Sequence, residues 1–205
     1  MATGFWGKKI GMTQVFVNDK VVPVTVIDTA LWVVTGTKTI ARDGYAAVQV
    51  GRVKPRYADQ KFDGSWIKDL SKYFSLVREV RMDNDSDAMK VGKPLSAAQD
   101  LKEGDFVNVT GMSKGCGFAG VVRRHGFGGP PGSHGSTMGN RPGSIGFITS
   151  QGKVIKGKKL PGRMGNKRCQ IDNLEVVQVN SDDQMVLVKG AVPGKAGSFV
   201  FVQKA

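Results

Sequence analysis

The residues that could do chemistry in this sequence are two histidines, two cysteines and a glycine fingerprint, all between Gly115 and Cys169. The run Gly115-Cys-Gly-Phe-Ala-Gly120 spells G-x-G-x-x-G after an expected strand, which is the pattern of a dinucleotide site. Such a site needs a helix that opens at the third glycine and an acidic residue about 20 positions further on. The glycines that follow from Gly126 argue against a sustained helix, and no acid appears before Asp172. The pattern therefore does not predict nucleotide binding.

Spacing also argues against nucleophilic catalysis and metal binding. His125 and His134 have no carboxylate near them in the sequence to orient them, and the neighbouring serines lack the elbow context of a nucleophile. With Cys116 and Cys169 they give four potential zinc ligands, but the set contains no short ligand pair. The cysteines are expected to be free thiols, because the N-terminal residues have no secretory signal core. We predict no catalytic residue, no metal, no cofactor and no small-molecule substrate.

Charge gives a positive indication of function. The formal net charge is +13, and no acidic residue lies between Asp105 and Asp172. The acid-free stretch from Phe106 to Ile171 holds 11 basic residues, and the rest of the chain holds 19 basic and 17 acidic residues. Because a field of one sign is costly through self-repulsion, a polyanion is the expected partner. The basic residues of the stretch are Lys114, Arg123, Arg124, Arg141, Lys153, Lys156, Lys158, Lys159, Arg163, Lys167 and Arg168.

Three other interpretations of this stretch fit its composition less well. A solvated basic face would normally mix both signs. A membrane surface is disfavoured, because no apolar run approaches the roughly 20 residues of a membrane span and frequent glycines prevent an amphipathic helix. A disordered linker is typical of glycine-rich composition, and 16 of the 28 glycines lie here, but linkers are usually uncharged. Glycines interspersed with cations favour a segment that threads between RNA helices. The protein is expected to be cytoplasmic.

The elements that must position this stretch are β-strands. Thr13–Val17 and Val21–Ile27 flank a turn at Asn18 to Lys20 and predict a hairpin, with Pro23 at an edge or a bulge. Further strands are expected on both sides of the stretch, which makes it a loop anchored at both ends of a barrel or sandwich. These strands are Leu31–Thr35, Tyr45–Val50, Phe106–Thr110, Leu174–Val179, Met185–Lys189 and Ser198–Val202.

Residues 54–99 differ in character, with mixed charges and several aromatic residues. Trp66 to Val77 is expected to form a short helix in a small α/β or irregular subdomain. The predicted fold is mainly β. The barrel comprises residues 1–53, 100–112 and 170–205, residues 54–99 form the subdomain, and residues 113–169 form the extended basic loop.

Several motifs resemble those of one family. The opening Gly4-Phe-Trp-Gly-Lys-Lys-Ile-Gly-Met-Thr13 and the run Asn108-Val-Thr-Gly-Met-Ser-Lys-Gly-Cys-Gly-Phe-Ala-Gly-Val-Val-Arg-Arg124 are similar to the L-three family of large-subunit ribosomal proteins, bacterial type. The similarity continues in family order to the end of the chain and is weakest over residues 54–99. Further matching motifs are His134-Gly135, Arg141-Pro-Gly-Ser-Ile-Gly146, Lys153-Val-Ile-Lys-Gly-Lys-Lys159, Met164-Gly-Asn166 and Val188-Lys-Gly-Ala-Val-Pro-Gly194.

The resemblance implies a six-stranded Greek-key barrel of the translation-protein type. It implies a structural protein, not an enzyme, that binds 23S rRNA near its 3′ end, nucleates early assembly and contacts neighbouring ribosomal proteins. The loop would reach toward the peptidyl-transferase centre with its tip at Arg141 to Ser150: Arg141, Pro142, Gly143, Ser144, Ile145, Gly146, Phe147, Ile148, Thr149 and Ser150.

The expected RNA-binding residues are the cations of the stretch together with Lys8, Lys9, His125 and His134. Phe118, Phe127 and Phe147 could stack on bases, although packing at the base of the loop is the preferred role of Phe118. Two positions depart from the family pattern. Cys116 stands where a basic residue is usual, and Thr149 stands where many bacterial members carry a methylated glutamine. A free RNA chaperone that uses the same loop, and an enzyme with a β core, are the alternative functions.

Overall fold

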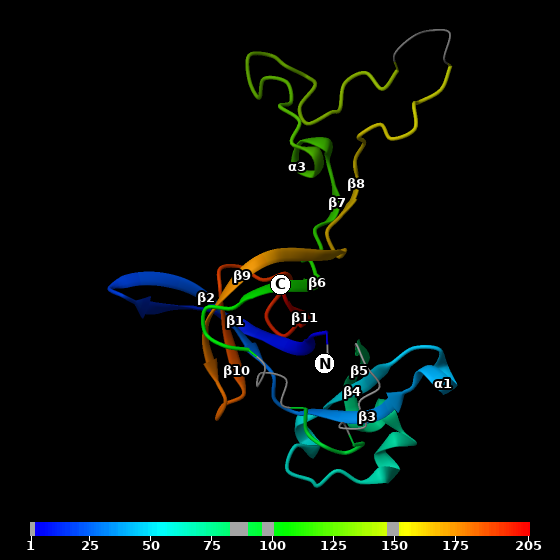
Figure 1. Cartoon of the computed structure of the whole chain (residues 1–205). Coiled ribbons are helices and arrows are strands. Elements are labelled where there is room, and N and C mark those ends of the chain that lie inside the picture. The colour runs from blue at the N-terminus through cyan, green and yellow to red at the C-terminus, as the bar shows by residue number, and fades with distance from the viewer. Residues whose placement is uncertain (1–2, 83–89, 96–100, 147–151) are drawn as a thin grey trace. The chain divides into compact units, whose positions relative to one another are not determined.

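The computed structural model describes residues 3–82, 90–95, 101–146 and 152–205, and it is mainly β, as predicted (Figure 1). The chain divides into two compact units. The body unit comprises Met1–Met112 and Arg168–Ala205, and the loop unit comprises Ser113–Lys167. Among the described residues, no helix is long and apolar enough to span a bilayer.

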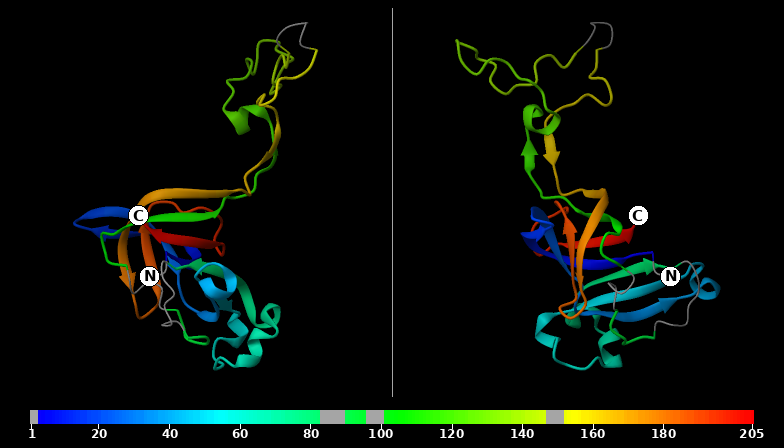
Figure 2. Two further views of the ribbon diagram at one scale, coloured as in Figure 1. Left: turned by 45° about the vertical axis from the view of Figure 1, so that its right-hand side comes forward. Right: turned by 60° about the vertical axis from the view of Figure 1, so that its left-hand side comes forward.

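Six antiparallel strands of the body unit form a ring, in which each strand pairs with two others. Their order is β1-β11-β6-β9-β10-β2, and β2 pairs in turn with β1 (Figure 2). The predicted hairpin is present, with Asn18 and Asp19 at φ values of 48° and 60° in the two-residue turn. The strands are β1 (Phe5–Val17), β2 (Lys20–Asp28), β6 (Phe106–Met112), β9 (Arg168–Asn180), β10 (Met185–Lys189) and β11 (Phe199–Lys204).

Alternate residues of these strands form the main core. Val107 and Val109 on β6, and Val186 and Val188 on β10, are fully buried two positions apart, as the pleat requires. Ile27 of β2 belongs to the same cluster. The β-branched side chains suit a pleated surface, and their burial stabilises the ring through the removal of apolar area from water.

A second sheet corrects the predicted domain boundary. Strands β3 (Trp32–Lys38) and β4 (Ala47–Val53) pair with β5 (Phe74–Arg81) in a separate three-stranded sheet, not with the ring. The assignment of residues 1–53 to the barrel is therefore wrong after Asp28, where β2 ends. Strand-forming patterns are alike in both sheets, and the pairing partners that separate them lie far away in the sequence.

The helix expected from Trp66 to Val77 is also wrong. The segment instead contains a 3₁₀ turn, a one-turn helix and then strand β5. Along β5 the buried Phe74 and Val80 face the core, while Arg78 and Glu79 are exposed, and these charges obscure the strand pattern in the sequence. The short elements are α1 (Ile40–Asp43), η1 (Pro55–Tyr57), η2 (Gly64–Ile67) and α2 (Leu70–Tyr73).

The ring and the three-stranded sheet share an apolar contact within the body unit. Trp32 is buried beside Phe199, with ring centroids 6.0 Å apart, and Trp6 packs against Phe201 at 5.1 Å. The buried Arg52 of β4 forms an ion pair of 2.7 Å with Asp28 of β2. Removing one partner of such a pair would leave an unpaired charge in a poorly solvated place. The pair therefore ties the sheet to the ring.

The loop unit has little regular structure. Strands β7 (Gly117–Ala119) and β8 (Gly162–Met164) form a short antiparallel pair, and α3 (Val121–His125) follows β7. Among the described residues 126–146 and 152–161, none belongs to a helix or a strand. A short helix begins after Gly120, but it is not sustained, as predicted, and it ends within five residues, where Gly126 adopts a φ of 70°.

Candidate RNA interface

The loop unit is tethered at both ends by paired strands. The chain leaves the body unit at the end of β6 and returns at the start of β9, and these strands pair with Met112 opposite Arg168. Inside the loop unit the two chain segments continue to pair, since the Ser113 amide donates to the Lys167 carbonyl at 2.9 Å. The two ends of the basic segment therefore start side by side.

A polar clamp holds the base of the loop. The Arg124 guanidinium donates to the Leu160 carbonyl oxygen at 2.7 Å, and His125 Nε2 lies 3.1 Å from the same oxygen. Because a carbonyl only accepts, Nε2 is the donor there. A Cβ atom at Gly162 would lie 2.6 Å from Arg124 Nη1, so glycine makes room for the guanidinium. Both residues were predicted to bind RNA, and both also fasten α3 to the returning chain.

A second close approach involves Gly165, which lies beside the β7–β8 pair. Its φ is 72°, and a Cβ atom there would collide with the carbonyl oxygen of Lys114. The Cys116 amide donates to the Met164 carbonyl at 2.9 Å next to this contact. Glycine is thus required at 165 for both its conformation and its size. This role of Gly165 was not predicted from the sequence.

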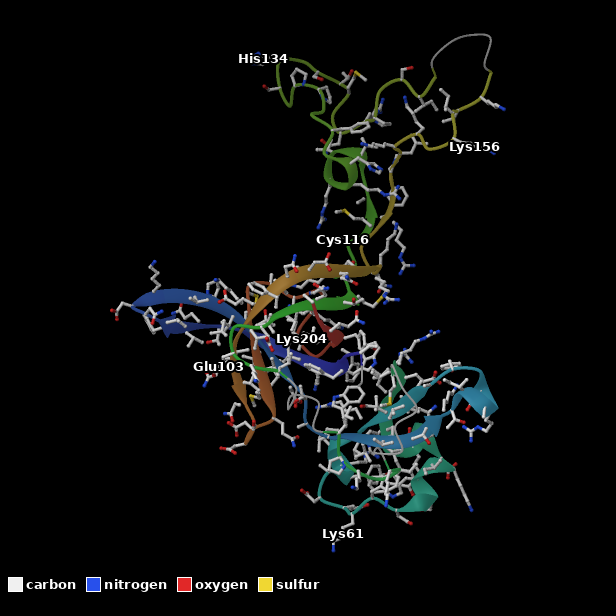
Figure 3. All side chains as sticks on the ribbon, in the orientation of Figure 1. Lys61, Glu103, Cys116, His134, Lys156 and Lys204 are labelled. Carbon is white, nitrogen blue, oxygen red and sulfur yellow. The ribbon has the colours of Figure 1, made fainter. Side chains whose placement is uncertain are left out.

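Most of the predicted cations are exposed and lack an acidic partner within the described residues. The loop unit contains ten basic residues and no acid, so it carries +10 of the net charge of +13. Figure 3 labels His134 and Lys156, both of which are exposed on irregular backbone. The exposed cations of the unit are Lys114, Arg123, Arg141, Lys153, Lys156, Lys158, Lys159, Arg163 and Lys167.

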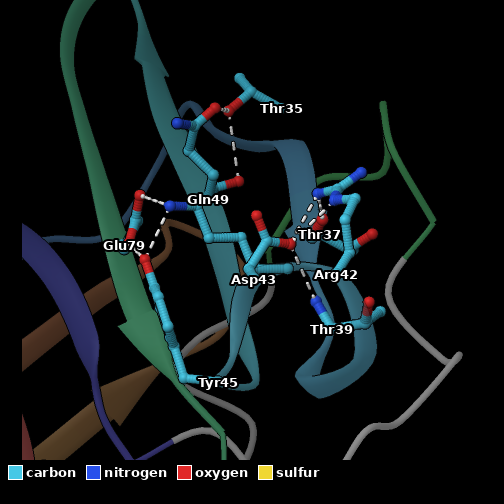
Figure 4. A network of polar contacts seen from close by, with 9 residues as sticks. Thr35, Thr37, Thr39, Arg42, Asp43, Tyr45, Gln49 and Glu79 are labelled. Carbon is cyan, nitrogen blue, oxygen red and sulfur yellow. Dashed lines mark hydrogen bonds and ion pairs between the residues drawn. The ribbon is translucent and has the colours of Figure 1, made fainter.

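Among the described residues of the body unit the cations are arranged differently, because five of them form ion pairs with carboxylates. In the network of Figure 4, Lys38 lies 2.9 Å from Glu79 and donates to the Tyr45 hydroxyl at 2.7 Å. The hydrogen bonds to Tyr45 and Glu79 raise the pKa of Lys38. The hydrogen bonds from Lys38 and Tyr45 lower the pKa of Glu79. Lys38 is therefore engaged in contacts within the body unit, unlike the exposed lysines of the loop unit.

Lys9 was predicted to bind RNA, but its position in the structure contradicts this. Its side chain is only 7% exposed, and its ammonium donates to the carbonyl oxygens of Val192 and Gly194 at 2.7 and 3.1 Å. Lys9 thus satisfies backbone groups inside the body unit and is not accessible to RNA. The neighbouring Lys8 is half-buried, and Arg168 is exposed at the start of β9.

The aromatic predictions had mixed outcomes. Packing at the base of the loop was the preferred role of Phe118, but 79% of its side chain is exposed, and β7 belongs to a sheet of only two strands. Phe127 is half-buried near His125, at 6.2 Å between ring centroids. Phe147 and positions 148–150 of the expected tip lie outside the described residues, whereas Arg141 to Gly146 are exposed.

Exposed aliphatic residues of the loop were missed by the sequence analysis. Ile145, Val154 and Ile155 are all more than two-fifths exposed among the cations. The available signal in the sequence was the presence of apolar residues in an acid-free, glycine-rich segment that cannot form a core.

Known proteins are similar to this chain over nearly its whole length. The model of the family described as ribosomal protein L3 matches residues 80–186. The large ribosomal subunit protein uL3 of Thermotoga petrophila is 42% identical over 97% of this chain and 95% of its own length. The uL3 protein of Carboxydothermus hydrogenoformans is 42% identical over all of this chain and 98% of its own. That of Citrifermentans bemidjiense is 42% identical over 99% and 97%.

Proposed function

The chain belongs to the ribosomal protein L3 family of structural proteins of the large ribosomal subunit, and from this premise we propose that its loop unit binds large-subunit rRNA. The predicted family and the predicted location in the large subunit are confirmed by these relatives. The observation that carries the RNA proposal is the set of ten basic residues without an acid in a unit that has almost no core. Such a unit lacks internal counter-charges, and phosphates would supply them.

The proposed contacts divide by role. The exposed cations from Lys114 to Lys167 neutralise phosphates, with Lys8 and Arg168 at the edge of the body unit. Arg124 and His125 keep the loop closed at its base, and the remaining donors of the guanidinium are free to reach RNA. Glycines such as Gly157, at a φ of 81°, allow the backbone to turn close to RNA.

The finer assignments follow from the family resemblance. The chain would bind the rRNA near its 3′ end early in assembly, beside other large-subunit proteins. Its loop tip from Arg141 would support the peptidyl-transferase centre, whose chemistry belongs to RNA. The six-stranded ring would correspond to the Greek-key barrel of translation proteins, a proposal supported by its closed order of strand pairs.

Sedimentation tests the proposal against a free RNA chaperone. Tagged full-length protein is expressed in cells, and lysates are separated on sucrose gradients at low and high salt. We expect the protein to migrate with large subunits and to protect rRNA from chemical probing. A predominantly free pool at low salt would contradict the structural role and favour the chaperone. A chain in which Phe127 to Gly152 are deleted serves as the matched control, since it keeps the body unit and the clamp residues Arg124 and His125.

A further inference from the structure

The hairpin of β1 and β2 continues beyond the other strands of the ring. Strand β11 pairs with β1 only over Phe5–Lys8, and β10 pairs with β2 only over Val24–Asp28. The remaining segment, Met12–Pro23, is a two-stranded ribbon, and Figure 1 shows it extending past its neighbours in dark blue. We call it the apolar ribbon. Because an isolated two-stranded ribbon is at best marginally stable in water, a covering partner is expected.

One face of the apolar ribbon exposes large hydrophobic side chains. Phe16 pairs directly with Val21, and Gln14 pairs with Pro23, so these residues share a face with Met12. Phe16 is 72% exposed, Val21 53% and Met12 52%. A single exposed hydrophobic residue is common, but a contiguous group on an unpartnered sheet face indicates an interaction site.

The edge of β1 is open along the same ribbon. Ser198 and Gly197 occupy it as far as Lys9, since the Lys9 amide donates to the Ser198 carbonyl and its own carbonyl accepts from the Gly197 amide. From Ile10 to Val17 no described strand pairs with this edge, and this stretch contains no proline. The β2 edge differs, because Pro23 lacks an amide donor and its carbonyl is taken by Gly190.

Charge decides which kind of partner fits. The apolar ribbon contains one acid, Asp19, and one base, Lys20, so it is neutral in a chain of net charge +13. RNA affinity depends on neutralised phosphates, and this face presents no cation beside its hydrophobic residues. We propose, resting on the proposed place of the chain beside other large-subunit proteins, that the apolar ribbon docks on one such protein, which adds a strand to the open β1 edge and covers Phe16, Val21 and Met12. This surface is separate from the proposed RNA contacts.

Site-specific photo-crosslinking tests the proposal. A benzoylphenylalanine probe replaces Phe16 in the full-length chain, and the same probe at Phe118, which is 79% exposed in the loop unit, is the matched control. Large subunits are isolated from cells, irradiated, and analysed for crosslinked protein and RNA. The probe at 16 is expected to crosslink to another large-subunit protein, and the probe at 118 to rRNA.

The outcomes separate the two proposals. Crosslinking at 16 to rRNA, to a second copy of this chain, or to nothing within isolated subunits would overturn the docking proposal. Crosslinking at 118 to protein alone, with the result at 16 unchanged, would count against the RNA contact and leave the docking proposal supported.

A competition experiment measures the contribution of the face. The double variant Phe16→Asp, Val21→Asp is expressed together with differently tagged wild type, and its share in large subunits should fall by about tenfold, as expected when one apolar contact is lost. Thr13→Asp, on the opposite face of the same ribbon, should reduce the share less than twofold. Thermal unfolding of the isolated variants confirms that the body unit is intact. An undiminished share of the folded double variant would overturn the proposal.

Discussion

The two units of this chain handle charge and apolar surface in opposite ways. In the part of the body unit that the structure describes, five cations form ion pairs, and valines at alternate positions form a buried core. In the loop unit no acid is present, and residues such as Ile145 and Ile155 are exposed. The body unit has a core of its own, although its apolar ribbon is exposed, whereas the loop unit leaves its charges and its apolar residues for a partner. Stability and binding are therefore expected to respond to different substitutions.

The largest expected effect concerns two isoleucines in different environments. Ile27→Ala in the ring core should lower the free energy of unfolding by about 3 kcal/mol, because it leaves a cavity among fully buried side chains. Ile155→Ala in the loop unit should change it by less than about 0.5 kcal/mol. Urea titration followed by tryptophan fluorescence measures both. Similar losses of unfolding free energy in the two variants would contradict the expectation that the stabilising core lies in the body unit.

The next effect concerns binding. Replacing Lys156, Lys158 and Lys159 together by glutamine should weaken rRNA affinity by about a hundredfold and lower the salt slope by about two to three. Unfolding should not change. Filter binding over a series of salt concentrations measures the affinity. The control replaces Lys61, Lys68 and Lys93 of the body unit together by glutamine, which removes the same charge. Equal losses for both variants would mean that only net charge matters.

A smaller, local effect is expected at the base of the loop. Gly165→Ala should destabilise the β7–β8 pair by about 2 kcal/mol, because alanine is strained at a φ of 72° and collides with the Lys114 carbonyl. Faster hydrogen exchange of the Cys116 amide would report it. Gly120→Ala is the control, since Gly120 has a φ of −69° and open space around its Cβ position. Unchanged exchange in Gly165→Ala would contradict the requirement for glycine.

The smallest effect is a dependence on pH that belongs to the body unit alone. Lys38 and Tyr45 lower the pKa of Glu79, so its contribution to stability is present above the unfolded pKa and is lost as pH falls through the folded pKa. For this exposed group we expect a few tenths of a kcal/mol. Glu79→Gln should flatten the acid limb of a stability profile measured below about pH 5. An identical profile in both proteins would exclude this role.

Sequence reasoning succeeded where the signal was local. The turn at Asn18 and Asp19 follows from residue types that tolerate positive φ, and the basic segment follows from counting charges. It failed where a distant partner decides the structure. The Lys9 ammonium donates to the carbonyl oxygens of Val192 and Gly194, and β4 pairs with β5 and does not join the ring. No short-range pattern marks such pairings.

The neighbouring exit and entry of the loop at Met112 and Arg168 impose a topological condition on assembly. A segment fixed at both ends has no free end, so it can pass through a closed ring of RNA only as a doubled chain, which needs a wider opening than a single strand. Otherwise the RNA closes around the loop afterwards. If the loop lies within tightly folded rRNA in the finished particle, binding before the surrounding helices complete their contacts avoids the need for such an opening. The connectivity of β6 and β9 would then favour one order of assembly.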